Sequence, residues 1–184
     1  RRECVAVIGP NGAGKTTLLK TVLSQIPPYA GKVELGANLK VGYFAQAHEG
    51  LVADNTLMEE IGTVAPNMLP AEARNYLARY GFQGEEVFAQ VNTLSGGERG
   101  RLALAKLALS DANLLMLDEP TNHLDLATQE VLQGVLANYP GTIMLVSHDR
   151  YLIDALATQI WELDVESASL QAFKGSYSEF RQFK

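Results

Sequence analysis

The fold is decided by one stretch near the start of the chain, which reads Gly9-Pro10-Asn11-Gly12-Ala13-Gly14-Lys15-Thr16. It fits the spacing G-x-x-x-x-G-K-[ST], between an apolar run that predicts a strand (residues 5–8) and a helical pattern (residues 15–25). Glycines at this spacing let backbone N–H groups point inward, and the helix start adds the positive end of its dipole. We therefore expect this loop to bind nucleotide phosphates, with Lys15 reaching the β- and γ-phosphates. A glycine-rich turn without a ligand is the alternative, which the flanking strand and helix disfavour.

A second apolar run, residues 114–117, ends in the adjacent acids Asp118 and Glu119. A strand that emerges from the core delivers Asp118 to its carboxyl edge, which is the ligand-binding edge of parallel sheets. We expect Asp118, through water, and the Thr16 hydroxyl to hold Mg²⁺. Glu119 is expected to polarise or orient the attacking water. An acidic turn in solvent is the alternative, which the neighbouring phosphate-binding loop disfavours.

A third segment, Leu94-Ser95-Gly96-Gly97-Glu98, precedes a helical pattern that runs to Leu109. Ser95 and Glu98 have the spacing of a capping box, so helix capping alone could explain both residues. Capping does not explain two consecutive glycines at a helix start. Together with the serine they make a second concave set of N–H donors, which suits another phosphate.

Short apolar runs alternate with helical patterns along the chain, which is typical of a parallel sheet with crossover helices. Further strands are predicted at residues 41–45, 143–146, 160–163 and 170–173, with a short edge strand at 31–36. One helix is predicted at residues 126–138. The breaker-rich segment 51–93 contains one clear helix, residues 71–80, followed by Gly81 as its C-terminal cap. We interpret this segment as a mainly helical insertion on the sheet.

Composition and charge narrow the class of protein. The 184 residues suit one domain with its own core, and the formal net charge of −6 argues against a nucleic-acid-binding face spread over the whole domain. The single cysteine, Cys4, lies in an apolar run, which favours a buried structural side chain over a reactive thiol. No segment approaches the ~18 apolar residues that span a bilayer, and no signal peptide is recognisable. We therefore expect a cytoplasmic protein with no membrane partner.

Together these segments resemble the ATP-binding cassette (ABC) family, and the resemblance extends from Val5 onward. It implies an α/β fold of the P-loop NTPase type: an ABC-type nucleotide-binding domain with a mainly parallel sheet, crossover helices and a small helical subdomain. Residues 94–98 resemble the signature motif of this family. The other matches follow in family order: Gln46 with the Q-loop, Asp118 and Glu119 with Walker B, Leu124-Asp125 with the D-loop, and His148 with the switch histidine.

The resemblance implies three groups of site residues. Catalysis would depend on Glu119, His148 and Lys15, and Mg²⁺ would be held by Thr16, Gln46 and Asp118. Contacts with ATP would come from the phosphate-binding loop, the Q-loop, the signature and the D-loop, that is from Gly9, Pro10, Asn11, Gly12, Ala13, Gly14, Lys15, Thr16, Thr17, Gln46, Ser95, Gly96, Gly97, Glu98 and Asp125.

Four stretches narrow the resemblance further. Residues 118–125 and 147–151 resemble the soluble ABC-F proteins, which carry two cassettes on one chain, while residues 73–79 and 175–178 resemble their second cassette. The chain would then be a single ABC ATPase domain (residues 1–184) with a helical subdomain inserted at about residues 51–110. Two strands and an adenine-stacking aromatic residue of this family would precede residue 1.

The implied mechanism needs a second cassette, on the same polypeptide or in a dimer, whose signature segment covers the ATP of this one. ATP closes the pair and hydrolysis reopens it. ABC-F proteins generally act at the ribosome, often in the tRNA exit region, which implies a translation factor or an antibiotic-resistance factor. Two rivals stay open: the ATPase subunit of a membrane transporter, and a binding scaffold that closes on ATP with little turnover. A chromosome-structure ATPase is disfavoured, because residues 46–94 are too few for its long coiled coils.

Overall fold

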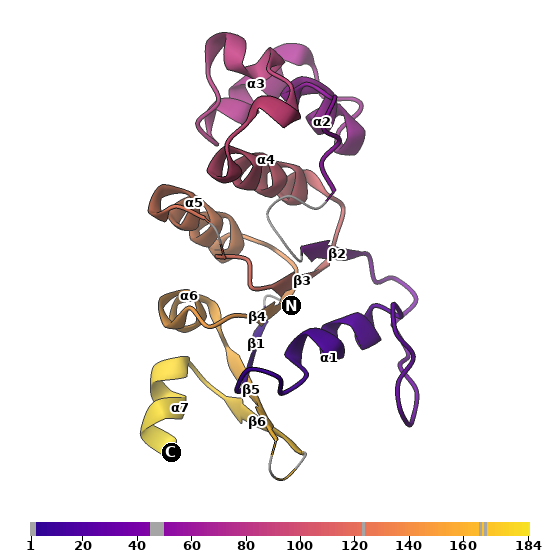
Figure 1. Cartoon of the computed structure of the whole chain (residues 1–184), viewed down its shortest axis with the longest axis vertical. Helices are drawn as coiled ribbons and strands as arrows, with labels where there is room; N and C mark the ends of the chain where they lie inside the picture. The colour runs from indigo at the N-terminus through magenta and orange to yellow at the C-terminus, as the bar shows by residue number, and fades with distance from the viewer. Residues whose placement is uncertain (1–2, 45–49, 123, 166, 168) are drawn as a thin grey trace. The chain divides into compact units, whose positions relative to one another are not determined.

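The computed structural model of the protein describes residues 3–44, 50–122, 124–165, 167 and 169–184. Six strands form one sheet in the order β2-β3-β4-β1-β5-β6 (Figure 1). The strands β2, β3, β4, β1 and β5 pair in parallel, and β6 pairs antiparallel with β5. Their bounds are β1 Cys4–Ile8, β2 Val41–Phe44, β3 Leu114–Asp118, β4 Thr142–Val146, β5 Gln159–Asp164 and β6 Ser169–Lys174.

The strand register brings the carboxyl ends of three strands, β1, β3 and β4, to one edge of the sheet. Val146 of β4 pairs with Val7 of β1 on one side and with Asp118 of β3 on the other. Because these strands are parallel and neighbouring, the loops that follow them leave the sheet at the same carboxyl edge. This edge therefore receives the phosphate-binding loop, Asp118 with Glu119, and the segment that begins at Ser147.

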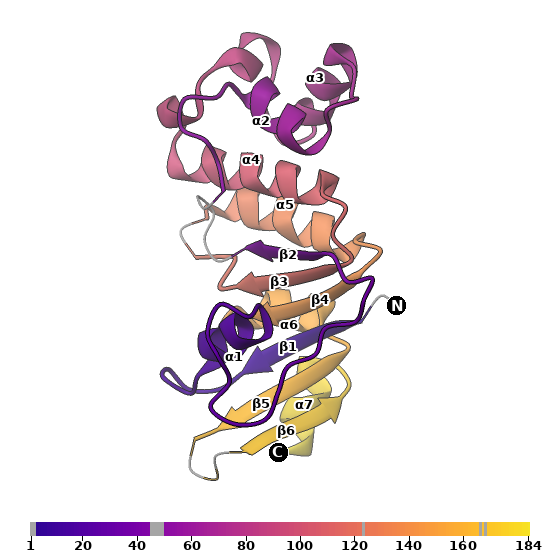
Figure 2. The same cartoon turned by 90° about the vertical axis from the view of Figure 1, so that its right-hand side faces the viewer.

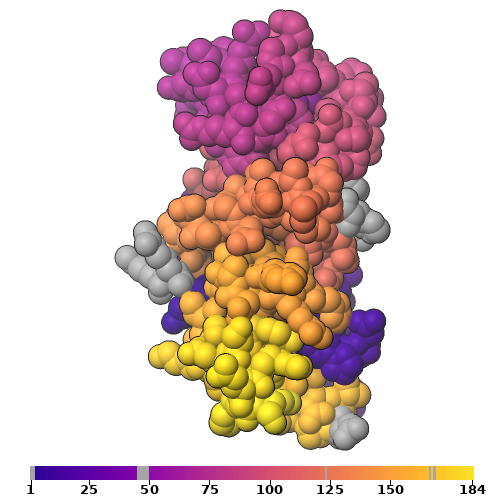
Figure 3. All heavy atoms as spheres, turned by 90° about the vertical axis from the view of Figure 1, so that its left-hand side faces the viewer, coloured from indigo at the N-terminus to yellow at the C-terminus, as the bar shows by residue number. Residues whose placement is uncertain are grey.

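Helices cover both faces of the sheet. One face is covered by α1 (Lys15–Val22) and the opposite face by α6 (Arg150–Leu156) and α7 (Tyr177–Phe183) (Figures 1 and 2). Figure 3 shows this side of the molecule, with α6 and α7 at its surface. Between α1 and the sheet, four side chains that are at most 1% exposed form a cluster: Leu19 from α1, with Val7, Met116 and Val146 from the strands. Burying each such side chain contributes roughly 1.5–3 kcal/mol, so this cluster fixes α1 and its loop against the sheet.

The chain divides into two compact units. We call the first the sheet unit; it comprises Arg1–Ala45, Ala112–Pro120 and Tyr139–Lys184. The second, the helical unit, comprises Gln46–Asp111 and Thr121–Asn138. Its first segment includes residues 51–110, which the sequence predicts to be a helical subdomain.

The helical unit consists of four α-helices and two short 3₁₀ turns among the described residues. The helices are α2 (Leu57–Val64), α3 (Pro70–Ala78), α4 (Gly96–Leu109) and α5 (Leu126–Ala137), and the turns are η1 (Gly84–Phe88) and η2 (Val91–Thr93). Helix α4 contacts α2 and α5, and α2 also contacts α3 and η1. Three of the four helices begin with a side-chain cap, from Thr56 (α2), Ser95 (α4) and Asp125 (α5).

Some predicted elements differ from the observed ones. The edge strand predicted at residues 31–36 is wrong: these residues pair with no strand that the structure describes, Gly31 has φ +78°, and Val33 and Leu35 are exposed. An alternating pattern forms a strand only where a neighbour supplies hydrogen bonds. Helix α1 ends at Val22, earlier than predicted, because Ser24 adopts a left-handed φ of +59°.

Candidate functional site

The predicted phosphate-binding loop, residues 9–17, joins β1 to α1. Gly9, Gly12 and Gly14 have φ values of +150°, +80° and +93°, which favour glycine. Gly9 also has no room for a side chain, because a Cβ there would lie 2.8 Å from the carbonyl oxygen of Leu163. Gly14 is the N-cap of α1, so the unpaired N–H groups of the first helical turn begin directly at the loop. The loop thus has the backbone form that binds anions.

Lys15 places a cation in this loop. The residue is 8% exposed, and its Nζ donates hydrogen bonds to the carbonyl oxygens of Gly9 (3.0 Å) and Pro10 (3.1 Å). Thr16 and Thr17 follow in the first turn of α1 and are exposed. A fixed ammonium group beside free N–H donors is suited to phosphate.

Asp118 ends β3 and has an unsatisfied oxygen. The residue is 7% exposed, and its Oδ1 is buried with no hydrogen-bond partner among the described residues. A buried carboxylate oxygen without a donor is unfavourable unless a cation or a bound water satisfies it. Carboxylate and hydroxyl oxygens are ligands that Mg²⁺ prefers, so Asp118 fits the predicted metal site.

Glu119 and His148 face each other at the ends of β3 and β4. Glu119 has a φ of +50°, which is uncommon for a residue with a side chain, and its N–H donates to the carbonyl oxygen of Val146 (2.8 Å). The backbone N–H of His148 donates to Glu119 Oε2 (3.2 Å), and His148 Nε2 lies 3.5 Å from Glu119 Oε1. The imidazole is more than half exposed and the carboxylate about one fifth. Such a pair can orient a water molecule and exchange protons with it.

The segment 95–98 forms a capping box at the start of α4. Ser95 donates to Glu98 Oε2 through its hydroxyl and its backbone N–H, both at 2.7 Å, and Ser95 Oγ accepts from the Glu98 N–H at 3.4 Å. The bond from the Ser95 hydroxyl is the main reason why the pKa of Glu98 is lowered. Gly96 and Gly97 form the first turn of the helix. In the free chain, Ser95 and Glu98 therefore cap the helix. Capping does not explain why Gly96 and Gly97 are glycines.

Asp125 begins α5 in the same unit. Its Oδ1 accepts from the Thr128 N–H at 2.8 Å, and this bond lowers the pKa of the Asp125 carboxyl. Leu124, the residue before it, is buried. Leu124 and Asp125 thus anchor the start of α5.

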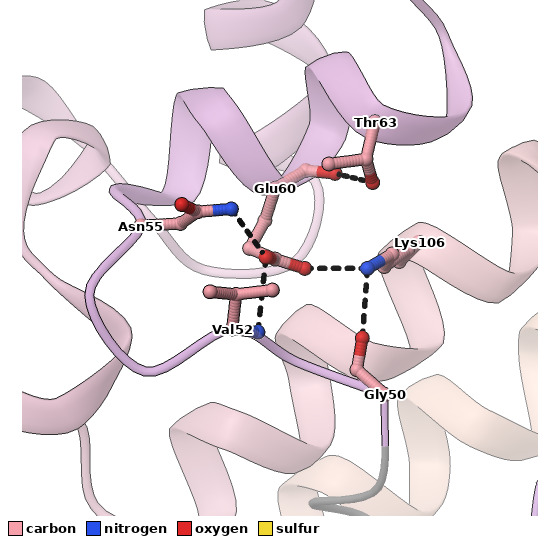
Figure 4. A network of polar contacts seen from close by, with 6 residues as sticks. All are labelled: Gly50, Val52, Asn55, Glu60, Thr63 and Lys106. Atoms are coloured by element: carbon pink, nitrogen blue, oxygen red, sulfur yellow. Dashed lines mark hydrogen bonds and ion pairs between the residues drawn. The ribbon is translucent and has the colours of Figure 1, made fainter.

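A buried ion pair ties α2 to α4, and Figure 4 shows the network around it. The side chain of Glu60 is fully buried; its Oε2 accepts from Lys106 Nζ at 2.6 Å, and its Oε1 accepts from the Val52 N–H (3.0 Å) and Asn55 Nδ2 (2.8 Å). Lys106 Nζ also donates to the carbonyl oxygen of Gly50 at 2.8 Å. The network holds the segment that precedes α2 against α4.

The predicted site residues divide between the two units. The sheet unit brings together the loop of residues 9–17, Asp118, Glu119 and His148 at one edge of its sheet. The helical unit holds Ser95–Glu98 and Asp125. Gln46 lies outside the described residues. Sequence reasoning missed the Glu60–Lys106 pair, because no local pattern links residues that are 46 positions apart.

Residues 1–122 match the family model described as ABC transporter. The chain is an ATP-binding cassette. The fold agrees with a solved structure, the RNase-L inhibitor, at a TM-score of 0.74 and 26% identity, covering 100% of this chain and 36% of the other. The predicted family and fold class are therefore confirmed.

Three relatives place the cassette among the ABC-F proteins. YdiF of Bacillus subtilis is 44% identical over 100% of this chain, and the ATP-binding protein Uup of Escherichia coli is 40% identical over 98%. The energy-dependent translational throttle protein EttA of Escherichia coli is 38% identical over 98%. The cassette spans 28%, 29% and 33% of the lengths of these relatives.

These matches establish a domain that binds ATP, from a family that hydrolyses it. Within the ranges that the structure describes, no helix combines the length and the apolar composition needed to cross a membrane.

Proposed function

We propose that this cassette hydrolyses ATP with Mg²⁺ as one half of a two-cassette ABC-F protein. The observation that carries this proposal is the Glu119–His148 pair, which lies on the same sheet edge as the loop that contains Lys15. A glycine loop alone explains binding. A carboxylate facing an imidazole beside that loop supports turnover as well.

Substrate binding begins with the phosphates of ATP. The N–H groups of residues 9–17 and the start of α1 surround them, and Lys15 exchanges its carbonyl partners Gly9 and Pro10 for phosphate oxygens. The free state already holds the ammonium at the loop. Little side-chain ordering is then left for binding, which favours affinity.

The water that attacks the γ-phosphate is oriented by Glu119 and His148. Glu119 accepts a hydrogen bond from the water, and the His148 imidazole contacts the γ-phosphate beside it. The main-chain bonds to Val146 and His148 fix the carboxylate before substrate arrives. Asp118, Thr16 and Gln46 would hold Mg²⁺, which when bound offsets the charge on the phosphates.

The second half of each site comes from another cassette. Ser95–Glu98 of this chain lies in the helical unit, and its first-turn N–H groups would contact the γ-phosphate bound by the partner cassette, with Asp125 at the same interface. ATP then favours the closed pair and hydrolysis the open one. We assign this chain to the second cassette of its parent protein.

The place of action that we propose is the ribosome, in the cytoplasm. The support is the name of EttA, a translational throttle protein, together with the ABC-F relatives. The parent protein would use the ATP-driven closure to regulate translation or to protect it from antibiotics.

Glu119→Gln tests the hydrolysis proposal. The amide keeps the size and most hydrogen bonds of the carboxylate but loses the charge that orients water, so we expect ATP to bind with unchanged affinity while steady-state phosphate release falls about 100-fold or more. Binding is measured by calorimetry, and release in a protein that carries this cassette together with a second one.

Glu34→Gln is the matched control. Glu34 is an exposed carboxylate paired with Lys32 outside the site, so this variant should release phosphate at the unmodified rate. Normal turnover in Glu119→Gln would contradict the role of Glu119. Loss of ATP binding in the same variant would show that its defect lies in folding and not in the chemical step.

A further inference from the structure

The second glycine of the signature segment has no room for a side chain. A Cβ built at Gly97 would lie 2.5 Å from Asp125 Oδ2, 3.5 Å from Asp125 Cγ and 3.8 Å from Thr128 Oγ1. Real Cβ atoms do not approach an oxygen to 2.5 Å. Gly97 lies within α4, where any residue can adopt the helical backbone, so the glycine is needed for space and not for its φ.

The Asp125 carboxylate can move aside only at the cost of a helix cap. It is the N-cap of α5 and accepts from the Thr128 N–H at 2.8 Å, a bond that also lowers its pKa. Turning the side chain away from Gly97 would break this bond and leave an unpaired N–H at the start of α5. The starts of α4 and α5 are thus in contact through one carboxylate.

We propose that Asp125 is a positioning residue for the Ser95–Glu98 turn of its own cassette. The carboxylate that caps α5 packs against Gly97 and sets the distance between the starts of α4 and α5. This adds a contact within one chain to the role across the cassette interface that the sequence predicts for Asp125. The consequence for activity rests on the proposed function, in which this turn contacts the ATP of a second cassette.

A different explanation of Gly97 makes different predictions. If the glycine is needed only so that phosphate can approach the backbone, then Gly97→Ala harms activity whatever residue stands at 125. If Asp125 is the obstacle, then shortening residue 125 relieves the harm. Serine is the suitable replacement, because its Oγ takes the place of Cγ, at 3.5 Å from the new methyl group, and serine is still a good helix N-cap.

The contact itself is tested in the chain alone, by thermal unfolding and amide hydrogen exchange. Gly97→Ala should lower the Tm and speed exchange of the Thr128 N–H, because the alanine displaces Asp125 and breaks its capping hydrogen bond with that N–H. In the Asp125→Ser background the same alanine should have little effect on either quantity. In the Asp125→Asn background it should stay harmful, because asparagine has the size of aspartate.

Gly134→Ala is the matched control, since Gly134 lies inside α5 and a Cβ built there would meet no atom within 4 Å. Alanine there should raise the Tm, as expected for a glycine inside a helix. ATP affinity of the chain by calorimetry is a second check, because the phosphate-binding loop belongs to the sheet unit. Unchanged affinity in Gly97→Ala separates a local shift from general unfolding.

The effect on turnover is measured in the two-cassette protein. Gly97→Ala should reduce phosphate release about 100-fold, the effect of misplacing a binding group by about 1 Å. The double variant Gly97→Ala/Asp125→Ser should match Asp125→Ser alone. Equal harm from Gly97→Ala in both backgrounds, in Tm and in turnover, overturns the proposal. A parent protein without turnover would refute the proposed function, while the Tm comparison would still decide the contact.

Discussion

Lys15 illustrates at the scale of one residue how the free chain prepares its site. The ammonium group is almost fully buried and bonds two carbonyl oxygens of its own loop. The same group is the cation that we propose to bind the phosphates of ATP. Its removal should therefore affect both the loop and the ligand.

Lys15→Ala should weaken ATP binding by about 2 kcal/mol, or about 30-fold in Kd, because the phosphates lose a charged hydrogen-bond donor. Calorimetric titration with Mg-ATP measures the change. Lys20→Ala is the control, since Lys20 is an exposed lysine in the last turn of the same helix. Equal affinities in the two variants would show that the loop is not the nucleotide site.

At the scale of the element, a different contact holds each end of α4. Its first turn contacts Asp125, and its last turn carries Lys106, which pairs with the buried Glu60. A buried pair adds little net stability, but loss of one partner leaves an uncompensated charge. The pair thus fixes where α2 and the segment from Gly50 to Asn55 lie against α4 (Figure 4).

Lys106→Met should lower the free energy of unfolding by about 3–5 kcal/mol, because Glu60 is then buried without its cation. Lys32→Met makes the same substitution in an exposed pair, Lys32–Glu34, and should change stability by less than about 1 kcal/mol. Urea unfolding of both variants measures the difference. Adding Glu60→Gln to Lys106→Met should recover part of the loss, and failure to do so would argue that the defect comes from lost packing.

The elements that could be predicted from sequence are those with a local cause. The strands at 5–8 and 114–117, the glycine loop and the Ser95–Glu98 cap all follow from adjacent residues, and the structure has each of them. Helix α2 was missed, although Thr56 and Glu59 have capping-box spacing at its start. The contacts Gly97–Asp125 and Glu60–Lys106 could not be predicted, because each depends on how two helices pack.

At the scale of the whole molecule, charge is divided unevenly between the two units. The sheet unit has ten Lys and Arg residues and ten Asp and Glu residues, whereas the helical unit has five and eleven. The whole net charge of −6 therefore belongs to the helical unit. Because RNA binding favours basic surfaces, this unit is a poor partner for ribosomal RNA on its own.

The full-length parent, trapped by Glu119→Gln and the equivalent change in its other cassette, should pellet with ribosomes only when ATP is present. The isolated chain should pellet weakly, because its acidic unit opposes contact with RNA and the rest of the parent would supply the cations. Pelleting with membranes instead would favour the transporter reading. Ribosome binding that does not depend on nucleotide would favour the alternative of a binding scaffold with little turnover.

The central place of β1 has a consequence for synthesis of the chain. Cys4 donates its N–H to Thr158 Oγ1, 154 positions along the chain, and β1 pairs with β4 and β5 on its two sides. Once it has left a translating ribosome, β1 must therefore wait for partners that are made much later in the chain. At ~5–20 residues per second the wait is on the order of 10 s, with an apolar strand unpaired throughout. Such distant pairing slows folding, so nascent chains rather than finished ones should be the form most dependent on chaperones.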